Sequence, residues 1–229
     1  MSRTVILQDL VFTKEEYSNC LNYISRERRN LLSKYHFNMD QYRGLASSLL
    51  ARCIINESSG IDNRDIVIEK SEYGKPICTS VKSIKFNLSH SGNCVVGVFD
   101  ENQVGIDVEV IQDKDNDDIV NRFFSKQEQD YYLTCEDKRK KFYELWTIKE
   151  AYIKYLGLGM SKGFDTFYSY WDNGQIRIRD EELQKDLSAY IECIDIHDYY
   201  LTVISETKTV FERWTIKDLL NKVSKLNMI

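Results

Sequence analysis

One short segment, Gly105–Val110, constrains the fold of this chain more than any other stretch of its sequence. Side chains alternate between the two faces of a β-strand, so its three aliphatic residues share one face while Asp107 and Glu109 share the other. Acidic residues are depleted in strands, and two carboxylates on one face repel each other. A solvated strand face is the ordinary explanation, but a divalent cation bound to both carboxylates also relieves the repulsion. The segment therefore predicts a strand with one buried face and one candidate metal-binding face.

Helical and strand-forming segments follow each other twice along the chain, which predicts an α+β fold. We expect helices from Thr13 to about Asn30, from about Met39 to Asn56, at Asp118–Phe124, from Ser125 onward, at Asp137–Leu158 and at Thr215–Lys225. We expect strands at Thr4–Phe12, Asp65–Glu69, Ile84–Leu88, Cys94–Phe99, Gly105–Val110, Phe164–Trp171, Gln175–Arg179, Tyr190–Asp195 and Tyr199–Ser205. A seam near residues 100–105 predicts two lobes of similar size, residues 1–103 and 104–229, with a functional site at their interface.

The charge and cysteine content exclude several classes of function. The chain carries 31 basic and 36 acidic residues, a net charge of −5, whereas nucleic-acid-binding proteins usually carry a basic excess. The same negative charge disfavours adhesion to anionic membranes, so an anionic ligand needs a local basic cluster. Six cysteines without a C-x-x-C pair are typical of buried thiols in a reducing compartment. The N-terminus lacks a signal peptide's apolar stretch and no run approaches transmembrane length, so we expect a cytoplasmic protein.

A second group of charges lies on the predicted helix Asp137–Leu158. At about 100° per residue, Glu150 and Lys154 lie together along one edge of its apolar stripe. A surface pair at this spacing, worth roughly 0.3–0.5 kcal/mol, explains both residues without a function. It does not explain Lys149, which falls within the apolar stripe and must reach water or an anion. Three charges on a largely buried face favour a functional site on this helix.

Two loops offer further candidates. Tyr73-Gly74-Lys75-Pro76 contains the only proline and is most simply a turn, but it also offers a rigid backbone and a cation to a nucleotide. Ser89-His90-Ser91 ends a predicted strand, and a lone histidine is more often structural than catalytic. The hydroxyls and the imidazole equally suit a phosphate group. A hydrolase triad is disfavoured because no Gly-x-Ser-x-Gly elbow accompanies these residues.

Two other charged segments have sufficient structural explanations by themselves. Ser25–Arg29 and Lys34, joined by Arg43 on the next helix, form a basic patch that a solvated helix face explains. Ser125 and Glu128 form a capping box, which accounts for Glu128 completely. We therefore do not place Glu128 in the site.

Together these segments resemble the Sfp-type 4′-phosphopantetheinyl transferases, the class that activates peptide and polyketide synthetases. The resemblance extends from about Ser25 to Phe167 and is weaker in the last sixty or so residues. Five motifs in matching order and spacing carry it: Tyr73-Gly74-Lys75-Pro76, Phe86-Asn87-Leu88-Ser89-His90-Ser91-Gly92, Gly105-Ile106-Asp107-Val108-Glu109, Phe123-Phe124-Ser125-x-x-Glu128 and Trp146-x-x-Lys149-Glu150-Ala151-x-x-Lys154.

The resemblance implies a pseudo-twofold monomer of two similar α+β lobes with coenzyme A bound at their interface. It implies transfer of the phosphopantetheine arm to a serine of an apo acyl or peptidyl carrier protein, with release of 3′,5′-ADP. By the same resemblance, Mg²⁺ is bound by Asp107, Glu109 and Glu150. Coenzyme A is bound by Lys75 and Pro76 near the adenine, by Arg28, Arg43 and His90 at the 3′-phosphate, by Ser89 at the phosphates, and by Lys154. Leu31 departs from the pattern, because many relatives carry a basic residue there, and the contact then rests on Arg28 alone or with Lys34.

Charge placement suggests how such a site would work. Glu150 is the candidate base for the carrier serine, directly or through a metal-bound water, and Lys154 stabilises or protonates the leaving 3′,5′-ADP. We expect the carrier to dock near Gly157–Phe164, which is apolar, glycine-rich and next to the catalytic helix, with Lys162 contributing to the contact.

Two other classes of function remain open at this point. One is a different Mg²⁺-dependent enzyme acting on a nucleotide diphosphate, such as a pyrophosphatase, which needs no carrier protein. The other is a non-catalytic module that binds coenzyme A or a carrier protein. The presence of every expected metal and lysine position disfavours the second.

Overall fold

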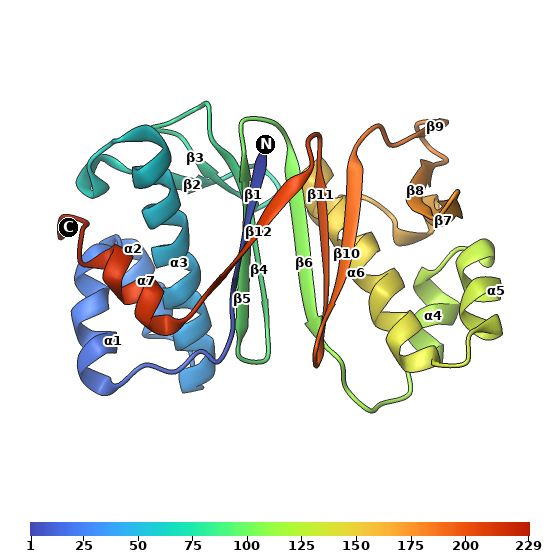
Figure 1. Ribbon diagram of the computed structural model, residues 1–229, viewed down its shortest axis with the longest axis horizontal. Helices are drawn as coiled ribbons and strands as arrows, with labels where there is room; N and C mark the ends of the chain where they lie inside the picture. Colours follow the sequence, from blue (N-terminus) through green and yellow to red (C-terminus); the bar gives the residue numbers. More distant parts are fainter.

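Two β-sheets meet side by side, with helices packed around both (Figure 1). The computed structural model describes residues 1–229, apart from the side chain of Met160. The first sheet has the strand order β12-β1-β5-β4 and the second has the order β10-β11-β6. Helix α3 packs on the first sheet and α6 packs on the second. The α+β class expected from the sequence is confirmed.

The elements around the first sheet come from both ends of the chain. The strands are β1 (Ser2–Leu7), β4 (Lys85–Ser91), β5 (Cys94–Asp100) and β12 (Thr209–Trp214), with the hairpin β2 (Ile68–Lys70) and β3 (Pro76–Cys78) beside them. The helices are α1 (Lys14–Cys20), α2 (Arg26–Leu32), α3 (Asn38–Ser59) and α7 (Ile216–Val223).

The elements around the second sheet come from the middle of the chain. The strands are β6 (Val104–Val110), β10 (Tyr190–Ile196) and β11 (Tyr199–Ser205), with the separate sheet β7 (Phe167–Asp172), β8 (Gln175–Asp180) and β9 (Lys185–Asp186). The helices are α4 (Asp117–Phe123), α5 (Lys126–Thr134) and α6 (Lys138–Leu156). Every helix of the described residues is too short or too polar to cross a membrane.

Several expected elements differ from the structure in their bounds, and two of the differences change the order of elements. The single helix expected up to Asn30 is wrong, because Ser25 is extended and caps a new helix, α2, by accepting a hydrogen bond from Arg28 N. The strand β12 was not expected, and it pairs in parallel with β1, the first strand of the chain. A partner so distant along the sequence leaves no local pattern, whereas a hairpin such as β7–β8 is signalled by Asn173-Gly174, where both residues have positive φ.

The return of β12 and α7 affects the lobes. The chain passes from the first sheet to the second between Asp100 and Val104, and the segment from Thr209 onward then lies back against the first sheet. The division into residues 1–103 and 104–229 therefore stays a prediction. By sequence β12 and α7 belong to the second part, but they pack with the first sheet and its helices.

Side chains, not a backbone ladder, join the two sheets where β4 and β6 lie next to each other. The Asn87 Oδ1 accepts a hydrogen bond from Ile106 N at 2.9 Å, and Ser91 Oγ accepts one from Val110 N at 3.1 Å. Both acceptors come from the same face of β4, on which Ser89 also lies. This junction places a row of short polar side chains along the acidic face of β6.

Gly105 allows α6 to pack unusually closely against β6. A Cβ atom at this position would lie 2.2 Å from Ala151 O and 2.5 Å from Tyr155 N, both of them backbone atoms of α6. No side-chain movement can relieve such a contact, so only glycine permits this approach. The contact brings the acidic strand within reach of the charged edge of the helix.

We predict that Gly105→Ala lowers the free energy of unfolding by about 1–3 kcal/mol or more, because helix and strand must separate. The matched control is Gly97→Ala in β5, where the added methyl would meet only side-chain carbons of Leu88, Phe99 and Leu50. Urea unfolding of the two variants measures the difference. Equal losses would contradict a special role for the Gly105 contact.

Candidate functional site

Asp107 lies at the centre of the junction between β4, β6 and α6. The residue is only 2% exposed, and its Oδ1 accepts hydrogen bonds from Ser89 Oγ at 2.8 Å and from Lys154 Nζ at 2.5 Å. Its Oδ2 is buried and has no hydrogen-bond partner among the described residues. An unpartnered buried carboxylate oxygen is costly, and it marks a position for a ligand atom.

The other two expected carboxylates, Glu109 and Glu150, lie close enough to Asp107 for its charge to raise their pKa values. Burial raises the pKa of Glu109, the charge of Asp107 adds to this, and a 2.7 Å hydrogen bond from Ser91 Oγ opposes it. Burial also raises the pKa of Glu150, against the effect of Lys154, and the charges of Asp107 and Glu109 raise it further. The sequence patterns on β6 and α6 therefore identified three carboxylates that lie close enough together for their charges to interact.

Lys154 balances this negative charge. Burial opposes the charged form of its amine, but the carboxylates of Asp107, Glu150 and Glu109 outweigh burial and raise the Lys154 pKa. Its ammonium also donates to Ser89 Oγ at 3.0 Å. The i,i+4 pair predicted on the helix edge is therefore part of the site, with Asp107 as the closest anionic partner of the lysine.

The donor set fits Mg²⁺ in its chemistry. Three carboxylates with neighbouring hydroxyls provide the hard oxygen ligands that this ion prefers, and Asp107 Oδ2 is free to bind. Among the described residues, no three acidic, histidine or cysteine side chains yet lie close enough to enclose a metal ion. Binding therefore requires Glu109 and Glu150 to swing inward and the Lys154 ammonium to leave Asp107.

A cluster of cations lies beside the carboxylates. His90 is an exposed residue, but desolvation by its neighbours lowers its pKa, and the positive charges of Arg43, Lys154 and Arg28 lower it further. These four side chains therefore lie in one neighbourhood. Arg43 NH1 donates to Gly92 O at 2.9 Å, while its buried Nε has no partner among the described residues. Such a cluster favours an anionic ligand.

Arg28 is held in place by the neighbouring helix. Its Nε donates to Ser48 Oγ at 2.8 Å and its NH2 donates to Gly44 O at 3.0 Å, both on α3. It lines a cavity of about 440 Å³ together with Leu31 and Pro76. The residue that departs from the family pattern, Leu31, therefore lines the same cavity and adds apolar surface to it.

Lys75 has a different position from the one its expected role suggests. Its ammonium donates to Val104 O at 2.8 Å and to Lys154 O at 2.6 Å, so it joins the Tyr73–Pro76 loop to β6 and α6. Burial, with a smaller contribution from Lys85, lowers its pKa to about 8. The loop is thereby fixed next to the site, and Pro76 presents its ring to the 440 Å³ cavity.

Lys149 and Glu128 lie away from the carboxylate cluster, on the opposite side of α6. The Lys149 side chain is fully buried, and its ammonium contacts Glu128 Oε2 at 2.7 Å and donates to Phe164 O and Phe167 O. The expected capping box of Glu128 with Ser125 is confirmed, and Ser169 donates two further hydrogen bonds to Glu128. The inference that Lys149 contributes a third charge to the site is wrong, because this lysine finds its anion in the packing of α5 and β7 against α6.

Lys162 is also not where a docking contact requires it. It is 5% exposed, and its ammonium contacts Asp180 at 3.0 Å and Glu182 at 2.5 Å. Asp180 also accepts a hydrogen bond from Tyr152 OH of α6. The expectation that Lys162 contacts a partner is therefore corrected, because its charge is used inside the molecule.

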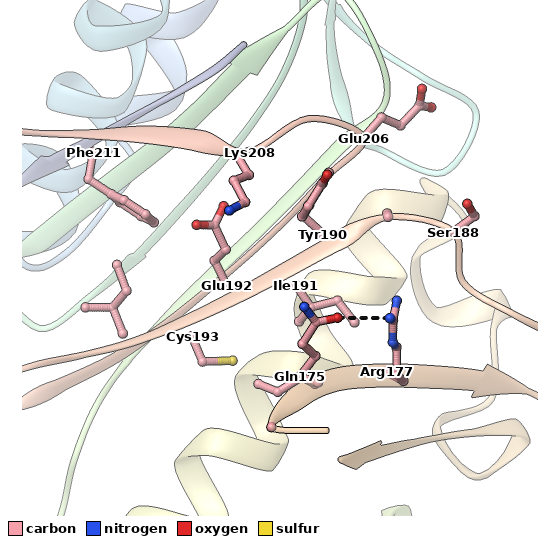
Figure 2. Close-up of a pocket in the computed structure, with 14 residues that line it drawn as sticks. Gln175, Arg177, Ser188, Tyr190, Ile191, Glu192, Cys193, Glu206, Lys208 and Phe211 are labelled. Atoms are coloured by element: carbon pink, nitrogen blue, oxygen red, sulfur yellow. Dashed lines mark hydrogen bonds between the residues drawn. The ribbon is translucent and has the colours of Figure 1, made fainter. Parts of the chain in front are cut away.

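A cavity of about 760 Å³ lies elsewhere, between β8, β10 and the segment that leads into β12 (Figure 2). Arg177, Lys208, Glu192 and Glu206 line it, and none of the expected site residues does. It is larger than the cavity at Arg28, but none of its lining side chains has a buried atom without a partner. We therefore place the functional site at the junction of β4, β6 and α6.

The sequence patterns missed two polar residues that shape this junction. Asn87 and Ser91 flank Ser89 at a period of two on β4, so all three face β6. That alternation was visible in the sequence, but nothing local showed that β4 has β6 as its neighbour.

Models of known families match both halves of the chain. Residues 12–103 match the model described as 4′-phosphopantetheinyl transferase, N-terminal, and residues 103–204 match the 4′-phosphopantetheinyl transferase superfamily.

Individual relatives extend this similarity. A 4′-phosphopantetheinyl transferase of Bacillus pumilus is 34% identical over 90% of this chain and 89% of its own. The 4′-phosphopantetheinyl transferase Sfp of Bacillus subtilis is 34% identical over 76% of this chain and 78% of its own. Among solved structures, the holo-[acyl-carrier-protein] synthase of Thermotoga maritima overlaps 46% of this chain and 64% of its own, with 23% identity and a TM-score of 0.38, too low to compare sites.

We predict that Lys149→Met or Glu128→Gln alone destabilises the protein by about 3–5 kcal/mol, because each leaves one charged or polar partner buried without its counterpart. The double variant removes both charges, so it should lose clearly less than the sum of the two single losses. Urea unfolding of the three variants closes this cycle, and strictly additive losses would argue against the pair.

Proposed function

The chain belongs to the 4′-phosphopantetheinyl transferase superfamily, and from this membership we propose that it transfers the 4′-phosphopantetheine arm of coenzyme A to a serine of an apo carrier protein, releasing 3′,5′-ADP. The observation that carries this proposal is the convergence of Asp107, Glu109 and Glu150 beside a cation cluster at the junction of the two sheets. The two family models meet at residue 103, which supports lobes of residues 1–103 for coenzyme A binding and 104–229 for the metal site and catalytic helix.

The cation cluster is the proposed site for the 3′-phosphate of coenzyme A. Arg28, Arg43 and His90 would contact it, and the free Nε of Arg43 supplies a donor that the protein does not use. Binding of an anion would raise the lowered pKa of His90 and let the imidazole donate both of its N–H groups. Pro76 is proposed to pack near the adenine. Lys75 acts indirectly, because its ammonium holds the loop in place by donating to the carbonyl oxygens of Val104 and Lys154.

Mg²⁺ is the proposed cofactor, held by Asp107, Glu109 and Glu150. When bound, it would neutralise the pyrophosphate and stabilise the charge that grows on the phosphoryl oxygens. Ser89, which already donates to Asp107, lies next to the proposed phosphate position.

Two residues of α6 are the proposed proton carriers. Burial raises the pKa of Glu150 in the metal-free protein, and a bound cation would oppose this effect. Glu150 is the proposed acceptor of the carrier serine's proton, directly or, more easily, through a water molecule. Lys154 holds its proton next to Asp107 and Ser89, where it can stabilise or protonate the leaving 3′,5′-ADP. Base and acid then occupy successive turns of one helix.

The carrier protein is proposed to dock near Gly157–Phe164, which continues directly from the C-terminal end of α6. This segment contacts the Tyr73–Pro76 loop, because a Cβ at Gly159 would lie 3.2 Å from Tyr73 O. Lys162 takes no part in this docking, since its charge is buried. A monomeric, cytoplasmic protein with a pseudo-twofold relation between its lobes remains our expectation.

We predict that incubation with Mg²⁺, coenzyme A and an apo carrier protein increases the carrier mass by one phosphopantetheine arm. Asp107→Ala should abolish the gain, and Glu101→Ala, an exposed acidic residue in the turn before β6, should not. Mass spectrometry of the carrier is the measurement. Release of 3′,5′-ADP and free 4′-phosphopantetheine with an unchanged carrier would favour a pyrophosphatase, and binding without any product would favour a non-catalytic module.

The phosphate assignment has its own test. We predict that wild-type protein prefers coenzyme A over dephospho-coenzyme A, and that Arg43→Ala reduces this preference by roughly 10- to 100-fold, as expected for loss of a charge-assisted hydrogen bond. Arg64→Ala, at a surface arginine paired with Asp62, is the control and should keep the preference. The KM values for the two substrates measure it, and an unchanged ratio in Arg43→Ala would contradict the assignment.

A further inference from the structure

A few buried polar atoms have no hydrogen-bond partner in the structure. The part of the chain whose side chains are described contains five: Arg43 Nε, Ser47 Oγ, Asp107 Oδ2, Asn116 Oδ1 and Tyr143 OH. Such atoms are rare in folded proteins, and each one calls for an explanation such as a missing ligand or water. Arg43 and Asp107 already belong to the proposed site. Tyr143 has no role in that site, although it lies on the same helix as Glu150.

Helix α6 and strand β6 run in opposite directions, and this places Tyr143 opposite the end of the acidic strand. Gly105 contacts the helix at Ala151 and Tyr155, near the end of α6. Further along β6, Asp107 pairs with Thr202 of the neighbouring strand β11. The hydroxyl of Thr202 is hydrogen-bonded to the hydroxyl of Thr147 on α6 at 2.8 Å. Tyr143 lies one helical turn before Thr147, on the same face, and so reaches the level of Glu109.

The surroundings of the phenol agree with this position. Burial raises the pKa of Tyr143 and the charge of Glu109 raises it further, while the nearby backbone N–H of Gln112, just beyond β6, opposes both without making a well-formed hydrogen bond to the hydroxyl. Its ring is held at 5.1 Å from the ring of Phe142 in an edge-on contact, within an apolar cluster between α4, α5 and α6. The hydroxyl is therefore protonated at neutral pH. Tyr143 as a whole residue is only 3% exposed, and it lies close to Glu109, a proposed metal ligand.

Glu109 has the complementary requirement. Only Ser91 Oγ donates to its carboxylate in the described part of the chain. A carboxylate that binds a metal is usually oriented by hydrogen bonds from residues behind it, and loss of such a residue weakens metal binding. A buried phenol whose O–H has no acceptor, close to a carboxylate that must turn inward to bind, is suited to that task.

We propose that the Tyr143 hydroxyl donates a hydrogen bond to Glu109, directly or through one water molecule, when Glu109 turns to bind the divalent cation. Tyr143 is then a positioning residue, which acts through Glu109 and does not contact coenzyme A or the carrier. This inference rests on the proposed function in one respect only, the binding of a divalent cation by Glu109.

The test compares two buried tyrosines of the same helix. Tyr143→Phe removes a hydroxyl that has no partner, whereas Tyr152→Phe removes one that donates to Asp180 Oδ2 at 2.7 Å, far from the carboxylate cluster. Mn²⁺ binding in the presence of coenzyme A, followed by electron paramagnetic resonance, measures metal affinity without requiring catalysis. Urea unfolding, together with kcat and the KM for coenzyme A at saturating metal, completes the comparison.

We expect Tyr143→Phe to weaken Mn²⁺ binding by about 10-fold or more, as is typical for loss of a residue that orients a metal ligand. Its unfolding midpoint and its KM for coenzyme A at saturating metal should match the wild type. Tyr152→Phe should do the reverse, with a lower midpoint and unchanged Mn²⁺ affinity.

Two results would overturn the inference. One is wild-type Mn²⁺ affinity in Tyr143→Phe, and the other is an equal loss of affinity in both variants, which would show a general effect of loosening α6. Failure of the proposed function is a separate result: wild-type protein that modifies no carrier, while Tyr143→Phe still weakens Mn²⁺ binding, would refute the transfer reaction and leave the role of Tyr143 intact.

Discussion

The close contact between Gly105 and the backbone of α6 is the constraint on which the site depends. Because no side chain separates the strand from the helix there, Lys154 reaches Asp107, and the carboxylate of Glu150 comes close to those of β6. The same approach lets Tyr143 reach the level of Glu109 two turns away. Loss of this contact would move all of these groups together, since they are carried by one rigid strand and one rigid helix.

Helix α6 is held on its other side by a different kind of interaction. The buried pair of Lys149 and Glu128 joins α6 to α5 and β7. Both carboxylate oxygens of Glu128 and the ammonium of Lys149 have hydrogen-bond or ion-pair partners. The carboxylate cluster on the site side is the opposite case. The pKa values of Glu109 and Glu150 are raised, an oxygen of Asp107 is unpartnered, and Lys154 alone supplies positive charge within bonding distance. One face of the helix is therefore electrostatically satisfied, and the other is the face on which we propose that a cation and an anionic substrate bind.

The site was predictable from the sequence where the signal was local. The period of two placed Asp107 and Glu109 on one face, the helical period placed Glu150 with Lys154, and the capping box of Ser125 with Glu128 is present. Contacts between distant segments were not predictable. Glu128 had one sufficient explanation as a cap, which concealed that its carboxylate also binds Lys149. The burial of Lys162 depends on Asp180 and Glu182 from the next hairpin, and the pairing of β12 with β1 joins the two ends of the chain. In each case the partner is set by tertiary packing and not by neighbouring residues.

The central claim is that Asp107, Glu109 and Glu150 bind one divalent cation at the junction of the two sheets. Anomalous diffraction from crystals grown with Mn²⁺ and coenzyme A tests it most directly. The account predicts a single strong peak within bonding distance of all three carboxylates, with the Lys154 ammonium displaced from Asp107 and the 3′-phosphate next to Arg43. Bound coenzyme A with no peak there, and with the Lys154–Asp107 contact intact, would contradict it.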